Sequence, residues 1–293
     1  MNPVLAHAEF PLAADLSDEE LATILERTGD PEGAAELRGS GAQSFGLFDV
    51  KSWKHASHQI GFIPAGTTGD LVKLQSGGQA APDPELQNSR VDVRLDRLHI
   101  QEYPGIGPHD VMISFSASNQ TTTDSEAVTF NQTFTIPKGD SAAVSGYPVF
   151  WGINTGTRGL SFQITVVNVR SAGDEALLSA MDSDVAKQGM SLLLTAQPAL
   201  KILTDLGTGI VKSFLSRNEN LKVQEVFMGL DFDATAFGVR LREGNYVVVQ
   251  VPEDNTIDWK TCVFHRSEQI ILGADHKPLP YNYFVFRVSR SPA

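Results

Sequence analysis

The chain has 293 residues, 41% of them hydrophobic, and a formal net charge of −12 from 23 basic and 35 acidic side chains. This length and composition suit a globular protein of one large domain or two of ordinary size. The acidic balance excludes simple electrostatic binding to nucleic acid, because phosphate recognition needs a basic face, and it disfavours docking on anionic lipid by charge alone.

Residues 16–29, LSDEELATILERTG, predict a short helix. Ser17 and Glu20 have the spacing of a capping box, and Gly29 is a stop signal. A second short helix is expected at 31–38. Residues 1–38 hold nine acidic and two basic side chains, so −7 of the −12 lies there. Such a run is either a solvated face or a docking arm for a basic partner.

The stretch SGGQAAPDPE at 76–85 has the composition of a linker. We therefore expect residues 1–80 to form an acidic N-terminal segment with short helices, separable from a second unit at 81–293. The first residues, MNPVLAHAEFPLAAD, lack a basic stretch followed by a long apolar run, so we expect no secretory signal. No run of apolar residues is long enough to predict a transmembrane helix.

After the linker, apolar and polar residues alternate with the period of half-buried strands. Five strands are predicted, at 90–101, 110–118, 126–136, 147–153 and 159–169. Further strands are predicted at 222–232, 238–242, 245–252, 259–265, 268–272 and 281–289. Turn residues between them favour a mainly β fold, an antiparallel β-sandwich with a helical N-terminal segment.

A helical insertion near 174–217 interrupts the strands, with one helix expected at 174–189 and another at 190–217. The second contains a wide apolar stripe, whose members include Leu203, Leu206, Ile210 and Phe214. A stripe of this width normally packs on a sheet or on a neighbouring helix. The alternative is a helix that binds lipid or a partner, although its polar face is not basic as in most interfacial helices.

The segments VDVRLDRLHIQEYPGIGPHDVMISFSAS and GLSFQITVVNVRSAGDEALL resemble strands and loops of a C2-type β-sandwich. The resemblance implies a phospholipid-binding fold in which loop carboxylates hold calcium, and the matching loops offer Glu102, Asp110, Asp174 and Glu175. Calcium takes about six to eight oxygen ligands. The first loop has prolines and glycines where aspartates would help, so a degenerate, calcium-independent form without a cofactor is favoured.

No sequence motif predicts a catalytic site. Gly-x-Ser-x-Gly, HExxH and kinase signatures are absent. Cys262 and His265 would lie on opposite faces of a strand, which is wrong for a thiolate–imidazole pair. Asp231 and Asp233 share one face of a predicted strand and offer an ion site or an acid–base pair, although turn and cap roles are commoner.

The sequence thus favours a non-enzymatic binding or adaptor module that contacts a protein partner through its loops or its insertion. Two alternatives stay open: a membrane-acting effector or peripheral membrane binder that uses the 190–217 helix, and an enzyme of unrecognised type that uses Asp231 and Asp233. Cys262 is the single cysteine, so no disulfide can form within the chain and a cytoplasmic, reducing location is expected.

Overall fold

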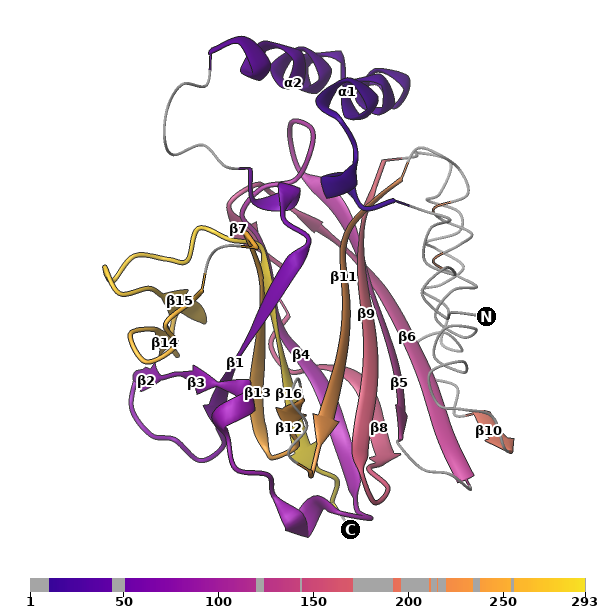
Figure 1. The fold of residues 1–293 in the computed structure, drawn as a ribbon, viewed down its shortest axis with the longest axis vertical. Coiled ribbons are helices and arrows are strands. Elements are labelled where there is room, and N and C mark those ends of the chain that lie inside the picture. Colours follow the sequence, from indigo (N-terminus) through magenta and orange to yellow (C-terminus); the bar gives the residue numbers. More distant parts are fainter. Residues whose placement is uncertain are drawn as a thin grey trace.

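Antiparallel sheets dominate the structure, a computed structural model (Figure 1). Strands hold 49% of the residues and helices 16%, so the prediction of a mainly β chain is confirmed. The residues described are 11–43, 51–119, 124–142, 144–170, 192–195, 211, 215, 220–233, 238–253 and 256–292.

Sheet A has six strands, in the spatial order β10 (Leu192–Thr195), β6 (Asp124–Ile136), β5 (His109–Asn119), β9 (Gly159–Val169), β11 (Leu221–Asp231) and β12 (Val239–Arg240). Its long strands follow the predicted alternation. On β5, Val111, Ile113 and Phe115 belong to the main buried core, while Ser114 and Ser116 lie on the opposite face.

Sheet B has seven strands. Six run in the order β3 (Gln75–Ser76), β1 (Ser57–Pro64), β13 (Gly244–Val251), β16 (Tyr283–Arg290), β4 (Arg90–Ile100) and β7 (Asp140–Ser141), and β8 (Tyr147–Asn154) also pairs with β4. A small sheet C contains β15 (Ile270–Leu272), β14 (Val263–His265) and β2 (Leu71–Lys73).

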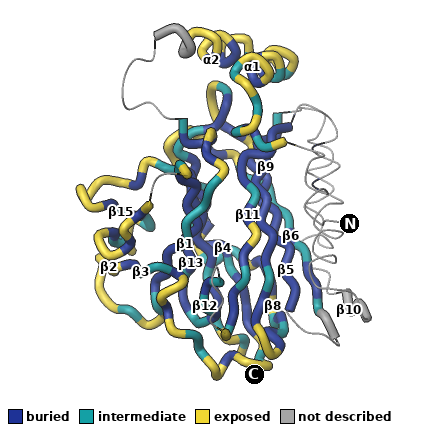
Figure 2. The backbone as a smooth tube through the Cα atoms, in the orientation of Figure 1, coloured by how far each residue is buried: buried dark blue, intermediate teal, exposed yellow. Residues whose placement is uncertain are grey.

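Sheets A and B pack face to face through aromatic side chains. The Phe115 ring centroid on β5 lies 6.1 Å from that of Phe284 and 6.0 Å from that of Phe286, both on β16. Both contacts are edge-to-face, the arrangement that aromatic pairs favour. Sheet C covers the other face of sheet B, where Trp259 and Phe264 share a second buried cluster with strands β13 and β16. Figure 2 shows the long strands as mostly buried.

Two helices lie over one end of the sheets (Figure 1). Helix α1 (Asp18–Arg27) begins with the predicted capping box: the Ser17 hydroxyl accepts from the Glu20 N–H, and the Glu20 carboxylate accepts from the Ser17 N–H. Gly29 follows with φ of 82°, a conformation that favours glycine. Helix α2 (Pro31–Gln43) is longer than the predicted 31–38.

The first 80 residues also contribute strands. β1 pairs with β13 along its whole length, from Ser57 opposite Val251 to Pro64 opposite Gly244. Gly77, in the stretch predicted as a linker, is buried so closely that an added Cβ would lie 2.8 Å from Val239. Separability of residues 1–80, as expected from the sequence, is untested; the pairing of β1 favours the opposite, because a cut at residue 80 would remove a strand from within sheet B.

The predicted insertion is described only in part. Residues 192–195 form strand β10 on the edge of sheet A, so the prediction of a helix from residue 190 is wrong there. Leu192, Leu193 and Leu194 are consecutive apolar residues, and such a run has no period that distinguishes a helix from a strand. Pairing with β6 determines that they form a strand. Val211 and Leu215 are helical and buried. The rest of the stripe, Leu203, Leu206, Ile210 and Phe214, lies outside the described residues, as does most of 174–217. In the described ranges, no helix is both long and apolar enough to cross a membrane.

The place of β1 generates a first prediction. A chain starting at residue 81 should be insoluble or molten, because β13 would lose the strand paired along its whole length and expose a long edge. A matched control is the full chain carrying a protease site in the exposed turn at Gly66, cut after folding. Its two fragments should co-elute under native conditions. A soluble, monomeric 81–293 fragment with an intact melting transition would show instead that residues 1–80 are separable.

Candidate binding site

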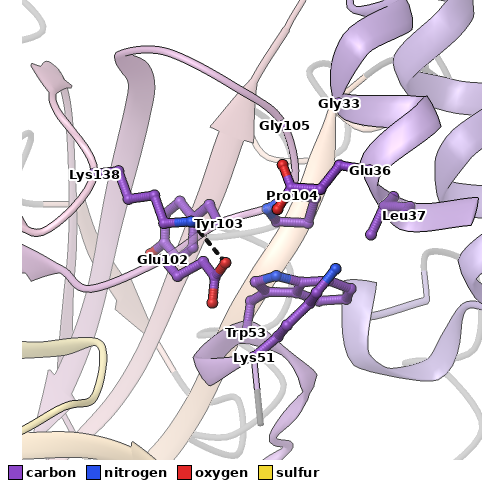
Figure 3. A pocket seen from close by; sticks show the side chains of 10 residues that line it. All are labelled: Gly33, Glu36, Leu37, Lys51, Trp53, Glu102, Tyr103, Pro104, Gly105 and Lys138. Carbon is purple, nitrogen blue, oxygen red and sulfur yellow. Dashed lines mark hydrogen bonds and ion pairs between the residues drawn. The ribbon is translucent and has the colours of Figure 1, made fainter. Parts of the chain in front are cut away.

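The capped end of the sheets gathers loops from distant parts of the chain. The loop between β4 and β5, residues 101–108, lies beneath α2 and beside the short 3-10 helix Ser52–Lys54 (Figure 3). The turn at 137–139 and the end of β9 complete this region. We name it the capped end. The ion pair of Asp30 and Arg170 fixes its geometry, and the side chain of Ile106 projects from it into solvent.

The carboxylate of Asp30 is the centre of the region. It accepts hydrogen bonds from the Gly33 N–H at 2.8 Å, which closes the start of α2, and from the Ile106 N–H at 2.9 Å. It also pairs with the Arg170 guanidinium at 2.8 Å, and both side chains are nearly buried, at 12% and 11% exposure. Burial alone would raise the pKa of Asp30, but the hydrogen bonds and the positive charge outweigh it and lower this pKa below its usual value.

Arg170, just after β9, uses its planar fork to join three elements. Besides Asp30, its guanidinium donates to the Thr28 hydroxyl at 3.1 Å and to the Pro104 carbonyl at 3.2 Å. Its backbone N–H donates to the Asn220 side chain, which precedes β11. The residues that follow α1, the β4–β5 loop and the end of β9 are therefore tied together by one side chain.

Gly105 allows this close approach. Its φ is 106°, and a Cβ there would overlap the Arg170 guanidinium and lie 2.7 Å from the Asp30 carboxylate. Any other residue would push the ion pair apart or move the loop. The glycine is thus required by the packing of the loop against the pair.

Ile106 follows at the tip of the loop, and its side chain is 50% exposed. Most exposed apolar residues on a protein need no explanation. This one differs because its backbone N–H is held by a nearly buried carboxylate, which fixes the backbone of the loop at this residue. The loop therefore presents the isoleucine from a defined backbone position.

A shallow hollow adjoins the loop. Its empty space, including the open mouth, is about 230 Å³, and the lining residues are Gly33, Glu36, Leu37, Lys51, Trp53, Glu102, Tyr103, Pro104, Gly105 and Lys138. Figure 3 shows Lys51 alongside the Trp53 indole and Lys138 reaching Glu102, an ion pair of 2.8 Å. The indole is itself buried, at 1% exposure, so the hollow offers a partner the charged side chains at its rim, among them Glu36 and Lys138.

Two buried rings lie at the base of the β4–β5 loop, that of Tyr103 within the loop and that of His109 directly after it. The centroids of Tyr103 and His109 are 5.9 Å apart in an edge-to-face arrangement. Burial raises the pKa of Tyr103, and burial together with the nearby Arg170 charge lowers the pKa of His109 to about 4. A similar shift occurs at the other end of the β4–β5 connection, where burial and Arg97 lower the pKa of His99 to about 4. Both histidines are therefore neutral at pH 7.

The predicted calcium residues are not brought together by the described structure. Glu102 pairs with Lys138, while Asp110 is exposed on β5 and accepts from the Thr135 hydroxyl at 2.6 Å. Asp174 and Glu175 lie outside the described residues. Among the residues that are described, no group of three or more histidine, cysteine or acidic side chains has the geometry to hold a metal ion. The calcium-independent form stays the prediction, with calcium binding as its untested alternative.

The members of the other two predicted pairs lie in different environments. Asp231 is buried at the end of β11, whereas Asp233 is exposed beyond the strand. Cys262 is buried in the turn before β14, not in the predicted strand at 259–265, and burial raises the pKa of its thiol. The His265 side chain is partly exposed, and its Nε2 lies 3.4 Å from Oδ2 of Asp70. A role of Asp231 and Asp233 in catalysis stays a prediction.

Sequence reasoning missed the residues that organise the capped end, namely Asp30, Arg170, Ile106 and Trp53. Asp30 and Arg170 are 140 residues apart, and no local pattern links them. One signal was present: Ile106 stands between two glycines and two prolines in YPGIGP, where an apolar residue has no strand or helix to support it. Loops of fixed shape on a rigid scaffold commonly carry function.

Comparison of the chain with protein-family models, with curated proteins and with solved structures finds no match. The resemblance to C2 domains therefore rests on the sequence pattern and stays a prediction.

The Asp30–Arg170 pair generates a second prediction. Arg170→Met should lower the free energy of unfolding by about 3–5 kcal/mol, because it leaves the Asp30 carboxylate nearly buried without its counter-charge. The double variant Asp30→Asn/Arg170→Met should recover part of this loss. Arg38→Met is the matched control: Arg38 also links α1 to α2, through Glu19 and Glu26, but at the surface, so its loss should change stability little. Equal effects of the two arginine variants in urea denaturation would contradict the account.

The buried histidines generate a third prediction. The unfolded chain takes up protons at these residues near pH 6.5, while the folded protein does so only near pH 4. Stability should therefore fall as pH drops from about 6.5 to about 4, by up to about 1.4 kcal/mol per pH unit for each histidine. The Asp30 contribution is kept over this range and is lost only at lower pH, since its folded pKa is depressed.

Urea denaturation at several pH values between 7.5 and 4.5 measures this slope. His109→Gln, which cannot take up a proton, should make the slope shallower than that of the unsubstituted chain. An unchanged slope would show that His109 is not held neutral by its surroundings.

Proposed function

We propose that this chain is a non-enzymatic binding module that contacts a protein partner through its capped end. The observation that carries the proposal is Ile106: the side chain is half exposed, yet its backbone is fixed by the nearly buried Asp30 carboxylate. A loop that is rigid before binding loses little conformational entropy on binding, so an apolar anchor on it contributes more to affinity.

The surroundings of Ile106 support a protein partner. Gly105, its neighbour, lines the hollow that also contains Trp53, Lys51 and Lys138. An exposed apolar anchor next to charged side chains has the composition of an interface: an apolar centre and a polar rim. The partner would place one apolar surface on Ile106 and polar groups against the charged side chains around the hollow.

The fold type, the lack of a cofactor and the location that we propose are inferred from the sequence. We regard the two packed sheets as a degenerate C2-like β-sandwich that binds without calcium or another cofactor. The engagement of Glu102 by Lys138 and of Asp110 by Thr135 supports this. The single cysteine, buried as a thiol, suits a reducing compartment, and the cytoplasm is the location we propose.

The test compares two equally exposed apolar residues. Ile106→Ser removes the proposed anchor, and Leu71→Ser, on β2 of sheet C and 57% exposed, is the matched control. Partners are captured from the source cells by a photo-crosslinking residue at the exposed Glu36 on α2, beside the hollow, and then purified. Ile106→Ser should weaken their binding by at least about tenfold, which is about 1.4 kcal/mol, with an unchanged melting temperature.

Three results would contradict the proposal. The first is that Ile106→Ser binds the partner as tightly as the unsubstituted chain, and the second is that Leu71→Ser loses as much affinity as Ile106→Ser. The third is that no protein partner is found and the chain instead binds phosphatidylserine vesicles with an affinity that falls in Ile106→Ser. The last result would move the chain to the class of peripheral membrane binders.

A further inference from the structure

A second exposed feature lies away from the capped end, on the edge strand β8. Trp151 is 62% exposed, which is the highest value for a large apolar side chain in the described part of the chain. Its neighbours Val149, Phe150 and Ile153 turn inward and are buried. An exposed tryptophan removes a large apolar surface from the core, so its position calls for a reason.

A bulge directs Trp151 outward. Across β4 and β8, Val91 faces Ile153 and Val93 faces Phe150, so Trp151 and Gly152 lie opposite Asp92 alone. Asp92 is 2% exposed and accepts from the Gly152 N–H at 3.0 Å. Bulges commonly redirect a side chain at the edge of a sheet. The buried carboxylate holds this one in place.

Arg94 covers the face of the tryptophan. Its guanidinium carbon lies 4.5 Å from the Trp151 ring centroid, a cation–π contact. Arg94 lies directly opposite Arg287 on β16, and like charges at such positions are unfavourable. Arg287 pairs with Asp96 at 2.7 Å, whereas Arg94 makes no ion pair with any residue that the structure describes.

The acceptors near the two arginines are already used. The Asp96 carboxylate also accepts from the Gly146 N–H at 2.9 Å and from the Asn245 amide. In addition, the Nε of Arg287 is buried without a hydrogen-bond partner. Asp92, which shares a face of β4 with Arg94, is likewise engaged, by the Gly152 N–H and the Ser291 hydroxyl. Among the described residues, Arg94 is thus an arginine of this surface without an ion pair.

We propose that Trp151, Arg94 and Arg287 form a docking surface for a protein segment that carries a carboxylate next to an apolar or aromatic side chain. The carboxylate would lie against the guanidinium of Arg94 and supply the counter-charge that this group lacks among the described residues, since arginine binds carboxylates in a planar, two-bond arrangement. The apolar side chain would pack on the exposed indole. Tryptophan and arginine are the residues most enriched at the centres of protein interfaces.

The charges nearby favour a protein segment over a bilayer. Arg290 pairs with Glu85 and Arg90 lies 3.7 Å from Glu126, so the surface has little net positive field. Binding to anionic lipid relies on such a field, and the whole chain carries a net charge of −12. Among the described residues, Trp151 is the one large apolar side chain that projects from this surface, which is little for insertion into lipid.

The experiment uses the full chain and a random peptide library displayed on phage, selected on the unsubstituted protein and depleted on Trp151→Ser. Selected peptides should carry Asp or Glu within a few positions of an aromatic residue or leucine. Synthetic copies should shift the tryptophan emission to the blue. That shift reports on Trp151, because Trp53 and Trp259, the other two tryptophans, are 1% and 6% exposed.

Arg94→Ala should weaken binding of labelled peptides by at least about tenfold, and Arg94→Lys should not restore it, because lysine lacks the planar fork. Lys277→Ala, an exposed cation between β15 and β16, and Ile106→Ser should leave binding unchanged, which separates this surface from the capped end. Melting temperatures confirm that each variant is folded.

Several outcomes would overturn the inference. They are selected peptides without an acidic residue, no Trp151-dependent peptides, or full affinity in Arg94→Ala. A blue shift with phosphatidylcholine vesicles containing about one-fifth phosphatidylserine, but not with peptides, would assign the surface to a membrane.

Discussion

The carboxylate of Asp30 is the constraint on which the capped end depends. Three groups from different parts of the chain point at it: the Gly33 N–H at the start of α2, the Ile106 N–H at the loop tip, and the guanidinium of Arg170 after β9. Removing any one of these partners would leave the nearly buried negative charge less well compensated, which costs free energy. The position of α2, the shape of the loop and the direction of Ile106 are thus determined together, and the burial of Tyr103 and His109 beneath the loop follows from them.

The same arrangement occurs twice in the molecule. At the capped end the partly buried Asp30 holds the N–H of the exposed Ile106, and on the edge of sheet B the buried Asp92 holds the N–H of Gly152 beside the exposed Trp151. In both cases a desolvated carboxylate fixes a short irregular backbone segment, and that segment presents one apolar side chain to solvent. Rigid presentation lowers the entropy lost on binding. This would lower the free-energy cost of the binding that we propose for each surface.

Much of the fold was predictable from local pattern, because strands β4, β5 and β9 turn apolar side chains to the core on one face and more polar ones to the other, and so alternate with period two although both faces are largely buried. The capping box of α1 is likewise local. The prediction was wrong at 192–195, where three successive leucines carry no period, and the role of residues 57–64 as a strand within sheet B was missed because pairing with β13 is not encoded nearby. The ion pair of Asp30 and Arg170 joins residues too distant for any spacing rule, so the site itself could not be found in this way.

The central claim is that the Ile106 backbone is fixed although its side chain is exposed. Amide hydrogen exchange at Ile106, followed by NMR, measures this directly, because its N–H is donated to the nearly buried Asp30 carboxylate. Exchange should be protected to a degree comparable with the ends of the neighbouring strands, and protection should vanish in Asp30→Ala while the amide of Val248 in the centre of sheet B stays protected. Exchange of the Ile106 amide at the rate of an unstructured loop in the unsubstituted chain would contradict the account.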